Sequence, residues 1–134
     1  MNAIKKIEVQ TQCHTEVINV TLQLADLVSG LSTGLALFYT PHTTVALLVC
    51  EDDPELRTDL ETVAEQMLAG LRPFSHIKNN KPNAEAHIFS ALFGTSLIIP
   101  IVDGQLDLGT YQNILLLEMD GPKTRQIRCQ LIDL

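Results

Sequence analysis

The segment from residue 94 to residue 118, GTSLIIPIVDGQLDLGTYQNILLLE, constrains the fold of this chain more than any other. Its first apolar run, residues 97–102, stops at Asp103-Gly104. An Asp-Gly pair between apolar segments favours a type I′ hairpin, because glycine adopts positive φ at little cost and the turn's twist suits the flanking strands. The later run, residues 114–117, fits a strand buried on both faces and is too short to span a membrane. The segment therefore predicts the central hairpin of a sheet.

Composition limits the class of protein. The chain has 134 residues, which predicts a single domain over 1–134 with a sizeable core. The hydrophobic content is 46%, but tryptophan is absent and aromatic residues make up 4%, so the core should be aliphatic. A net charge of −7 and the absence of a basic run argue against nucleic-acid binding, as does the lack of aromatic residues for base stacking.

The N-terminus and the cysteines bear on location. MNAIKKIEVQ has two lysines but no apolar segment, which predicts no signal peptide, no membrane anchor and a cytoplasmic protein. The three cysteines, Cys13, Cys50 and Cys129, are odd in number and lack the spacing of a metal site. We expect all three to be small buried hydrophobic residues.

Periodicity along the rest of the chain predicts five further strands and three helices. Alternating apolar residues predict strands at 7–10, 17–20, 34–39, 43–50 and 125–131, and helical spacing predicts helices near 24–31, 54–70 and 84–93. Asp53 and Asn83 are expected to cap the second and third helices. Residues 72–82 read as a surface loop. The predicted fold class is α+β, with mostly antiparallel strands and two or three helices.

Three histidines are the first candidates for chemistry. His42 lies at a strand corner, His76 in the loop and His87 at the start of the third helix. Three neutral imidazoles with an open fourth position form a common catalytic zinc arrangement, and the open position binds water or a substrate oxygen. Spacing alone leaves open the alternative that the three are unrelated surface or hydrogen-bonded residues.

The charged candidates could have structural roles, such as turn carboxylates or salt bridges, as well as functional ones. Glu51 ends an apolar strand and could serve as a metal ligand or a base, whereas Asp107 could be an ordinary turn carboxylate. Arg125 shares a strand face with core residues. It could recognise phosphate or form a salt bridge with Glu118 or Asp120 at the rim of the sheet.

Several motifs together resemble one known family. The chain carries His42-Thr43-Thr44, an NAxAH segment over 83–87 and a DGxLxLGTxQ segment over 103–112, with Glu118 and Arg125 following. These segments, in this order and spacing, resemble the YjbQ family, which is also called the secondary thiamine-phosphate synthase family. The resemblance covers nearly the whole chain. Two positions depart from it: Cys50, where the family usually has Asn, and Tyr111, where it has Trp.

The resemblance implies a β-sandwich-like core, a homotrimer and a site near a subunit boundary that can hold a divalent metal such as zinc. It matches His42, His76 and His87 as the metal ligands. The catalytic candidates are Glu51, Asp107, Gln112 and Arg125, and Glu51 matches the family's glutamate after the strand that follows His42-Thr43-Thr44.

The activity that the resemblance implies is condensation of a pyrimidine diphosphate with a thiazole phosphate, which gives thiamine phosphate and pyrophosphate. This reaction requires neutralisation of a diphosphate leaving group, to which a metal, Arg125 or Lys123 could contribute. An acidic chain without a glycine-rich phosphate loop is poorly equipped for two phosphorylated substrates. Two alternatives therefore stay open: a metal-dependent hydrolase of another small metabolite, with Glu51 as general base, and a non-enzymatic trimer that binds a ligand or metal.

Overall fold

A computed structural model describes residues 3–77 and 82–134 of the chain. The strands are β1 (Lys5–Gln10), β2 (Glu16–Asn19), β3 (Thr33–Tyr39), β4 (Val45–Cys50), β5 (Ser96–Val102), β6 (Gln105–Leu106), β7 (Asn113–Glu118) and β8 (Thr124–Asp133). The helices are α1 (Thr21–Asp26), α2 (Pro54–Gln66) and α3 (Ala84–Phe93), with a short 3₁₀ turn, η1 (Ala69–Leu71).

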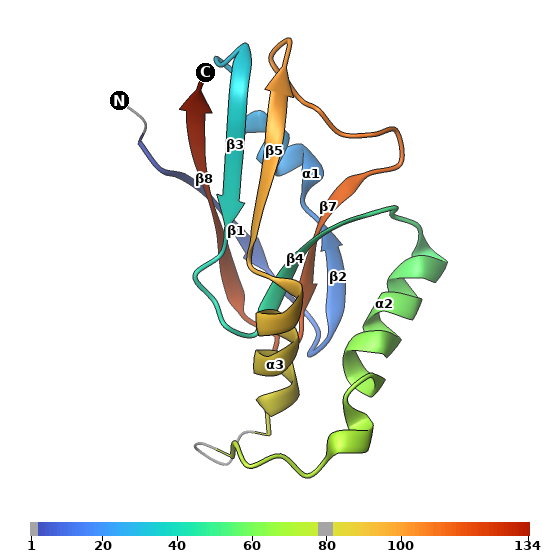
Figure 1. Cartoon of the computed structure of the whole chain (residues 1–134). Helices are drawn as coiled ribbons and strands as arrows, with labels where there is room; N and C mark the ends of the chain where they lie inside the picture. The colour runs from blue at the N-terminus through green and yellow to red at the C-terminus, as the bar shows by residue number, and fades with distance from the viewer. Residues whose placement is uncertain (1–2, 78–81) are drawn as a thin grey trace.

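The strands form two antiparallel sheets, and the elements stack in three layers (Figure 1). One sheet has five strands in the order β1-β8-β3-β5-β6, and the other has three in the order β2-β7-β4. Helices α2 and α3 cover the face of the smaller sheet that points away from the larger one. The predicted α+β class with mainly antiparallel strands is confirmed.

Two apolar cores separate the layers. The first lies between the two sheets and is closed by α1. Its buried residues are Val9, Val20, Leu24, Val28, Ala36, Phe38, Val45, Leu47, Ile99, Ile101, Ile114, Leu116, Ile127 and Cys129. The second lies between the smaller sheet and helices α2 and α3, and it contains Val17, Ala46, Ala64, Leu68, Ala86, Phe89, Leu115, Leu117 and Met119. Strand β7 contributes alternate residues to both cores, which confirms the prediction that it is buried on both faces.

The predicted hairpin is only partly present. Asp103 and Gly104 have φ values of 52° and 77°, so both central turn residues adopt the positive φ that a type I′ turn requires. The second arm, however, pairs with β5 for only two residues, β6. The Asp107 N–H donates to the Pro100 carbonyl at 2.8 Å, and the chain then leaves the sheet. The prediction that residues 94–118 form one central hairpin was wrong, because the second apolar run belongs to the other sheet as β7.

The helix starts differ in how they are capped. Asp53 precedes α2 and accepts a hydrogen bond from the Leu56 N–H at 2.9 Å, as predicted. Asn83 precedes α3 but does not cap it with its side chain. The Asn83 Nδ2 instead donates to Asp120 Oδ2 at 3.1 Å, so the expected cap was wrong because a carboxylate from the β7–β8 connection takes the amide.

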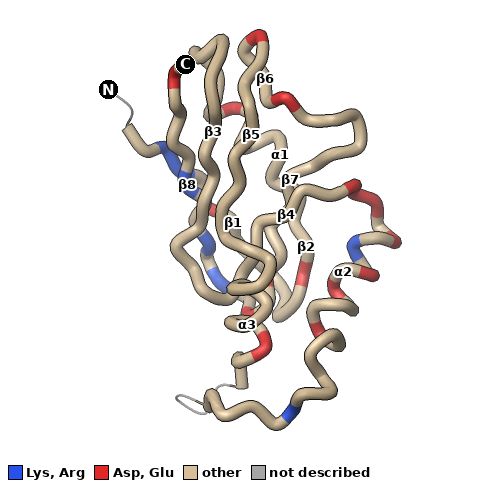
Figure 2. The backbone as a smooth tube through the Cα atoms, viewed as in Figure 1, with Lys and Arg blue, Asp and Glu red and all other residues tan. Residues whose placement is uncertain are grey.

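The three cysteines differ in burial, and the charged residues are unevenly distributed over the elements. Cys129 is buried as expected, but Cys50 is half-buried and Cys13 is exposed in the β1–β2 connection, so the expectation fails for those two. Figure 2 shows acidic residues along α2 and basic residues along β1 and β8. Within the described residues, no helix is long and apolar enough to cross a membrane.

Candidate functional site

The structure brings His42 and His87 to one cavity of about 490 Å³. His42 comes from the β3–β4 connection, and His87 lies in the first turn of α3. The side of α3 that faces this connection also contributes Ser90. The cavity is lined by Thr40, Pro41, His42, Thr43, His87, Ser90, Ala91, Gly94 and Thr95. Two imidazoles and four hydroxyl residues therefore surround one space.

His76 joins the same group through His87. The centroids of the two rings lie 5.1 Å apart in an edge-to-face arrangement. His76 is exposed and belongs to the segment that leads into α3. His87 therefore shares a cavity with His42 and packs against His76, whose side chain lines a different cavity with Phe74 and Ile77.

On its β3 side, the backbone of β8 near the site lacks a partner strand. Strand β3 pairs Tyr39 with Arg128, so Pro41, two residues further, would stand opposite Gln126. Proline has no N–H to donate to the Gln126 carbonyl, and the ladder ends there. The Thr40 hydroxyl takes over this role and donates to the Gln126 carbonyl at 2.8 Å.

The side chain of His42 pairs with the backbone N–H of the same residue, Gln126. The Gln126 N–H donates to His42 Nε2 at 2.9 Å. A neutral imidazole carries one proton, and the nitrogen that accepts a hydrogen bond is the unprotonated one. The proton of neutral His42 therefore resides on Nδ1 in this arrangement.

The surroundings of His42 favour its neutral form. Burial lowers the pKa of His42 first, and the positive charge of Arg125 lowers it further. Arg128 and Lys123 act in the same direction, whereas Glu118 opposes them. The ring is therefore uncharged at neutral pH.

These observations bear directly on the predicted zinc site. A histidine that binds a metal does so through an unprotonated nitrogen, and its other nitrogen carries the proton. His42 Nε2 accepts from a backbone N–H, which leaves Nδ1 protonated and unavailable as a ligand. Over residues 3–77 and 82–134, no group of three or more His, Cys, Asp or Glu side chains is placed to hold a metal ion. The described residues do not fit a three-histidine zinc centre with His42 in this orientation.

Arg125 forms a buried ion pair beside the site. Its Nε donates to Glu118 Oε1 and its Nη2 to Thr44 Oγ1, both at 2.8 Å, and Nη2 also contacts Glu118 Oε2. The side chains of Arg125 and Glu118 are 4% and 0% exposed. The sequence left a rim salt bridge and phosphate recognition open for Arg125. The structure shows a salt bridge with Glu118, buried in the core instead of lying at the rim.

Glu118 is held by more than the arginine. The Thr11 hydroxyl donates to its Oε1 at 2.8 Å, and the N–H groups of Met119 and Asp120 donate to its Oε2 at 3.0 Å. Burial by itself would raise the pKa of Glu118, but the hydrogen bonds from Arg125, Asp120 and Thr11 outweigh it and lower the pKa. The carboxylate is therefore charged, satisfied and fixed.

The remaining predicted residues lie at the other end of the smaller sheet. Strand β4 pairs Val45 with Glu118 near the histidines and Cys50 with Asn113 at the far end. Five residue steps along a strand span about 17 Å. Glu51 follows Cys50 and is exposed, so one chain does not bring it to the histidines.

Asp107 and Gln112 belong to that far end as well. Asp107 is exposed where β6 ends, and the Gln112 side-chain oxygen accepts from the Gly109 N–H at 2.8 Å to close the turn before β7. Within one chain, therefore, neither side chain reaches the cavity of His42 and His87.

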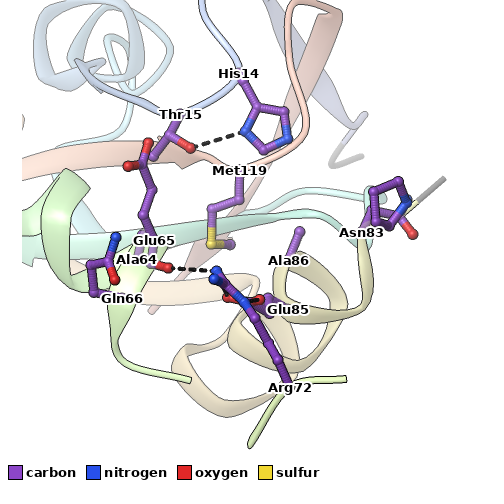
Figure 3. Close-up of a pocket in the computed structure, with 11 residues that line it drawn as sticks. His14, Thr15, Ala64, Glu65, Gln66, Arg72, Asn83, Glu85, Ala86 and Met119 are labelled. Carbon is purple, nitrogen blue, oxygen red and sulfur yellow. Dashed lines mark hydrogen bonds and ion pairs between the residues drawn. The ribbon is translucent and has the colours of Figure 1, made fainter. Parts of the chain in front are cut away.

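A separate cavity of about 270 Å³ lies between α2, α3 and the β1–β2 connection (Figure 3). Arg72 donates from Nη2 to the Glu65 carbonyl at 3.1 Å and forms an ion pair with Glu85. His14 hydrogen-bonds to Thr15 on the opposite side. None of the predicted site residues lines this cavity.

Comparison with known proteins identifies the family. The family model described as UPF0047 protein YjbQ-like matches residues 5–134. The chain belongs to the YjbQ-like UPF0047 family. It is 37% identical over 122 residues to a UPF0047 protein of Archaeoglobus fulgidus, covering 91% of this chain and 95% of the relative.

Solved structures of YjbQ-like proteins share the fold. A YbjQ-like protein of unknown function from Sulfolobus solfataricus P2 superposes with a TM-score of 0.92 at 29% identity, covering 100% of this chain and 99% of that one. A hypothetical protein from Aeropyrum pernix K1 gives a TM-score of 0.91 at 33% identity, covering 98% of this chain and 99% of that one.

Sequence reasoning overlooked residues that act through the backbone or through hydroxyl groups. Gln126 holds His42 with its main-chain N–H, which no side-chain pattern indicates. Thr40 carried one usable signal, since a threonine before a proline at a strand end can replace the missing donor. Ser90 is 3% exposed and lines the cavity from α3, but its helical position resembles that of any core-facing small residue.

Proposed function

We propose that the chain is a small-molecule enzyme whose active site is the cavity between His42 and His87. The proposal rests on His42 and His87, which line one cavity, and on His76, which packs against His87. A histidine beside a cavity is the usual acid or base of enzymes near neutral pH, and His87 provides such a group beside His42, whose Nδ1–H can donate a hydrogen bond. The substrate class is a small phosphorylated metabolite, and we expect the enzyme to act in the cytoplasm.

The first reaction to test is the formation of thiamine phosphate from a pyrimidine diphosphate and a thiazole phosphate. The hydroxyls of Thr43, Ser90 and Thr95 supply donors for phosphate oxygens. The nearby cations are already engaged, Arg125 by Glu118 and Lys123 by Asp120 at 2.8 Å. Binding of a diphosphate would therefore depend on the hydroxyls and imidazoles of the cavity.

A metal ion is not needed for any step of this proposal. The predicted zinc dependence is tested separately by elemental analysis of the purified protein after incubation with zinc. His76→Ala and His87→Ala each remove one predicted ligand, and His14→Ala is the matched control because His14 is an exposed histidine outside the cavity. Stoichiometric zinc that is lost in the first two variants and kept in the control would support the metal site, and a parent that stays empty would reject it.

The same variants test the enzyme proposal. Thiamine phosphate and pyrophosphate release are measured together in the parent, His87→Ala and His14→Ala. We expect turnover in the parent and in His14→Ala, and at least about a hundredfold loss in His87→Ala if the imidazole acts as a general acid or base. Equal rates in His87→Ala and His14→Ala would reject His87 as catalytic. A folded parent with no turnover would reject this reaction and favour the binding-protein alternative.

We also propose that three copies of the chain associate through the outer face of the five-stranded sheet. Apolar side chains gather there without a covering element: Ile98 is 62% exposed and Val102 is 48% exposed on β5. The register places Leu37 beside Ile98 and Leu35 beside Pro100, so the patch is continuous across β3 and β5. We call these five residues the outer patch.

The outer patch adjoins the histidine cavity. Tyr39 and Ser96 are paired at the end of the β3–β5 ladder, and the next residues along each strand, Thr40 and Thr95, line the cavity. A second copy seated on the outer patch would lie near the cavity mouth. This placement supports a site near a subunit boundary, where another copy could contribute the exposed Glu51.

A further inference from the structure

We propose that His42 is a hydrogen-bond donor to an anionic oxygen of the ligand, through Nδ1–H, and that it is not a metal ligand. The inference rests on the proposed function only in taking this cavity as the ligand site.

The first step is the fixed tautomer. The N–H of Gln126 belongs to a strand that is paired with β1 on its other side, so its direction is set by the sheet. It reaches His42 Nε2 at 2.9 Å, and the Thr40 hydroxyl binds the carbonyl of the same residue at 2.8 Å. A ring turned over would place a carbon against the N–H and leave it without an acceptor. The sheet therefore selects the Nδ1–H form.

The second step is that Nδ1 is available. Among the described residues, His42 Nδ1 makes no hydrogen bond. It is also not a buried atom without a partner, since the described residues contain one such side-chain atom and it is Asn83 Oδ1. Since Nδ1 is unpartnered and does not belong to that class, it is not fully buried. Since His42 lines the cavity and its Nε2 is occupied, Nδ1–H is the group that it can offer to a ligand.

The third step is the chemistry of the ligand atom. A protonated ring nitrogen requires an acceptor, and the hydroxyls of Thr43, Ser90 and Thr95 can donate to the same atom or its neighbours. Arg125 is paired with Glu118 and Lys123 with Asp120, so the selectivity of the cavity comes from the ring N–H and the hydroxyl groups. These groups together favour a phosphate or carboxylate oxygen over a metal cation.

The test is nitrogen NMR of the protein labelled with ¹⁵N, at a pH where the rings are neutral. The ring signals of His42 are identified through the hydrogen-bond coupling between the Gln126 amide nitrogen and Nε2, and by their absence in His42→Asn. If that variant does not fold, the coupling alone makes the assignment. We expect a protonated Nδ1, an unprotonated Nε2 and a measurable coupling. A protonated Nε2 or an absent coupling would overturn the proposal.

Two titrations on the same sample separate the alternatives. Zinc at one equivalent should leave the Nδ1–H signal and the coupling in place, and loss of the Nδ1 proton on zinc addition would show that His42 is a ligand. Inorganic phosphate should shift His42 Nδ1 in a saturable manner, with sodium chloride at equal ionic strength as the control. If phosphate does not shift the His42 signal, the donor role is rejected. The ring would then serve only as the acceptor of the Gln126 N–H of β8. These readouts need no turnover, so they can succeed or fail independently of the enzyme assay.

Discussion

At the scale of single residues, the buried pair of Glu118 and Arg125 decides how the strands beneath the site are held. The two side chains join the end of β7 to the start of β8, and Thr44 and Thr11 attach β4 and the end of β1 to the same pair. A buried pair of this kind contributes little net stability by itself but is costly to break, because one charge is left without a partner.

Glu118→Gln is therefore predicted to lower the free energy of unfolding by about 3–5 kcal/mol, since the Arg125 guanidinium would remain buried opposite a neutral amide. Denaturant unfolding measures the change. Lys123→Met is the matched control, because it breaks an ion pair with Asp120 in which the lysine side chain is 42% exposed. An exposed pair of that kind should cost about 0–1 kcal/mol. Equal losses in both variants would contradict the importance of burial.

The same pair predicts a pH dependence. The pKa of Glu118 is lower in the folded chain than its ordinary value of 4.5, because the hydrogen bonds from Arg125, Asp120 and Thr11 outweigh burial. The stability that this carboxylate contributes is therefore present above pH 4.5 and is lost as the pH falls through the folded pKa. Below pH 4.5 the parent should lose stability more steeply than Glu118→Gln, by up to about 1.4 kcal/mol per pH unit. Parallel curves in acid would show that Glu118 does not titrate in this way.

The sequence was enough to single out candidate residues where the type of side chain alone indicates their chemistry. The three histidines stood out because few side chains in the chain titrate near neutral pH. Glu118 carried a signal too, as a carboxylate that ends the apolar run of β7. The type of side chain does not show which residues it meets in the fold. Arg125 binds Glu118 across the β7–β8 connection. Glu51 lies at the opposite end of β4 from the histidines.

At the scale of elements, the sequence predicted a structure correctly where residues adjacent in the chain determine it. Asp103-Gly104 forms the expected turn because two positive φ values suffice to make it. The length of its second arm depends on whether a strand finds partners in the same sheet, and β7 finds β2 and β4 instead. Asn83 shows the same effect, since Asp120 competes for the side chain that would cap α3.

The capping of α2 gives a prediction at this scale. Asp53→Ala removes the side-chain acceptor of the Leu56 N–H, so the free energy of unfolding should fall by about 1 kcal/mol. Thermal or denaturant unfolding measures the loss. Asp53→Asn is the control, since an amide oxygen can accept the same hydrogen bond and should keep most of the stability. A loss in Asp53→Asn as large as in Asp53→Ala would mean that the charge, and not the cap, stabilises this helix start.

At the scale of the whole molecule, no helix or strand within residues 3–77 and 82–134 covers the outer face of the larger sheet. Helices α2 and α3 protect the smaller sheet, and the smaller sheet protects the inner face of the larger one. The sequence could not reveal the outer patch, because alternation along β5 shows two faces without saying which of them another element covers. A continuous apolar face without a covering element is typical of a surface that another chain occupies.

Ile98→Glu tests the proposed homotrimer at the centre of the outer patch. In the assembly the new carboxylate would be buried without a partner, and threefold symmetry would repeat that cost at every interface. We expect the parent to sediment as a trimer and Ile98→Glu as a folded monomer in analytical ultracentrifugation. Leu22→Glu is the matched control, because Leu22 is 80% exposed on α1 and lies outside the patch, so this variant should remain trimeric. A parent that sediments as a monomer would reject self-association. A trimer that survives Ile98→Glu would place the interface on another face, and a subunit seated there would have no reason to border the cavity of His42 and His87.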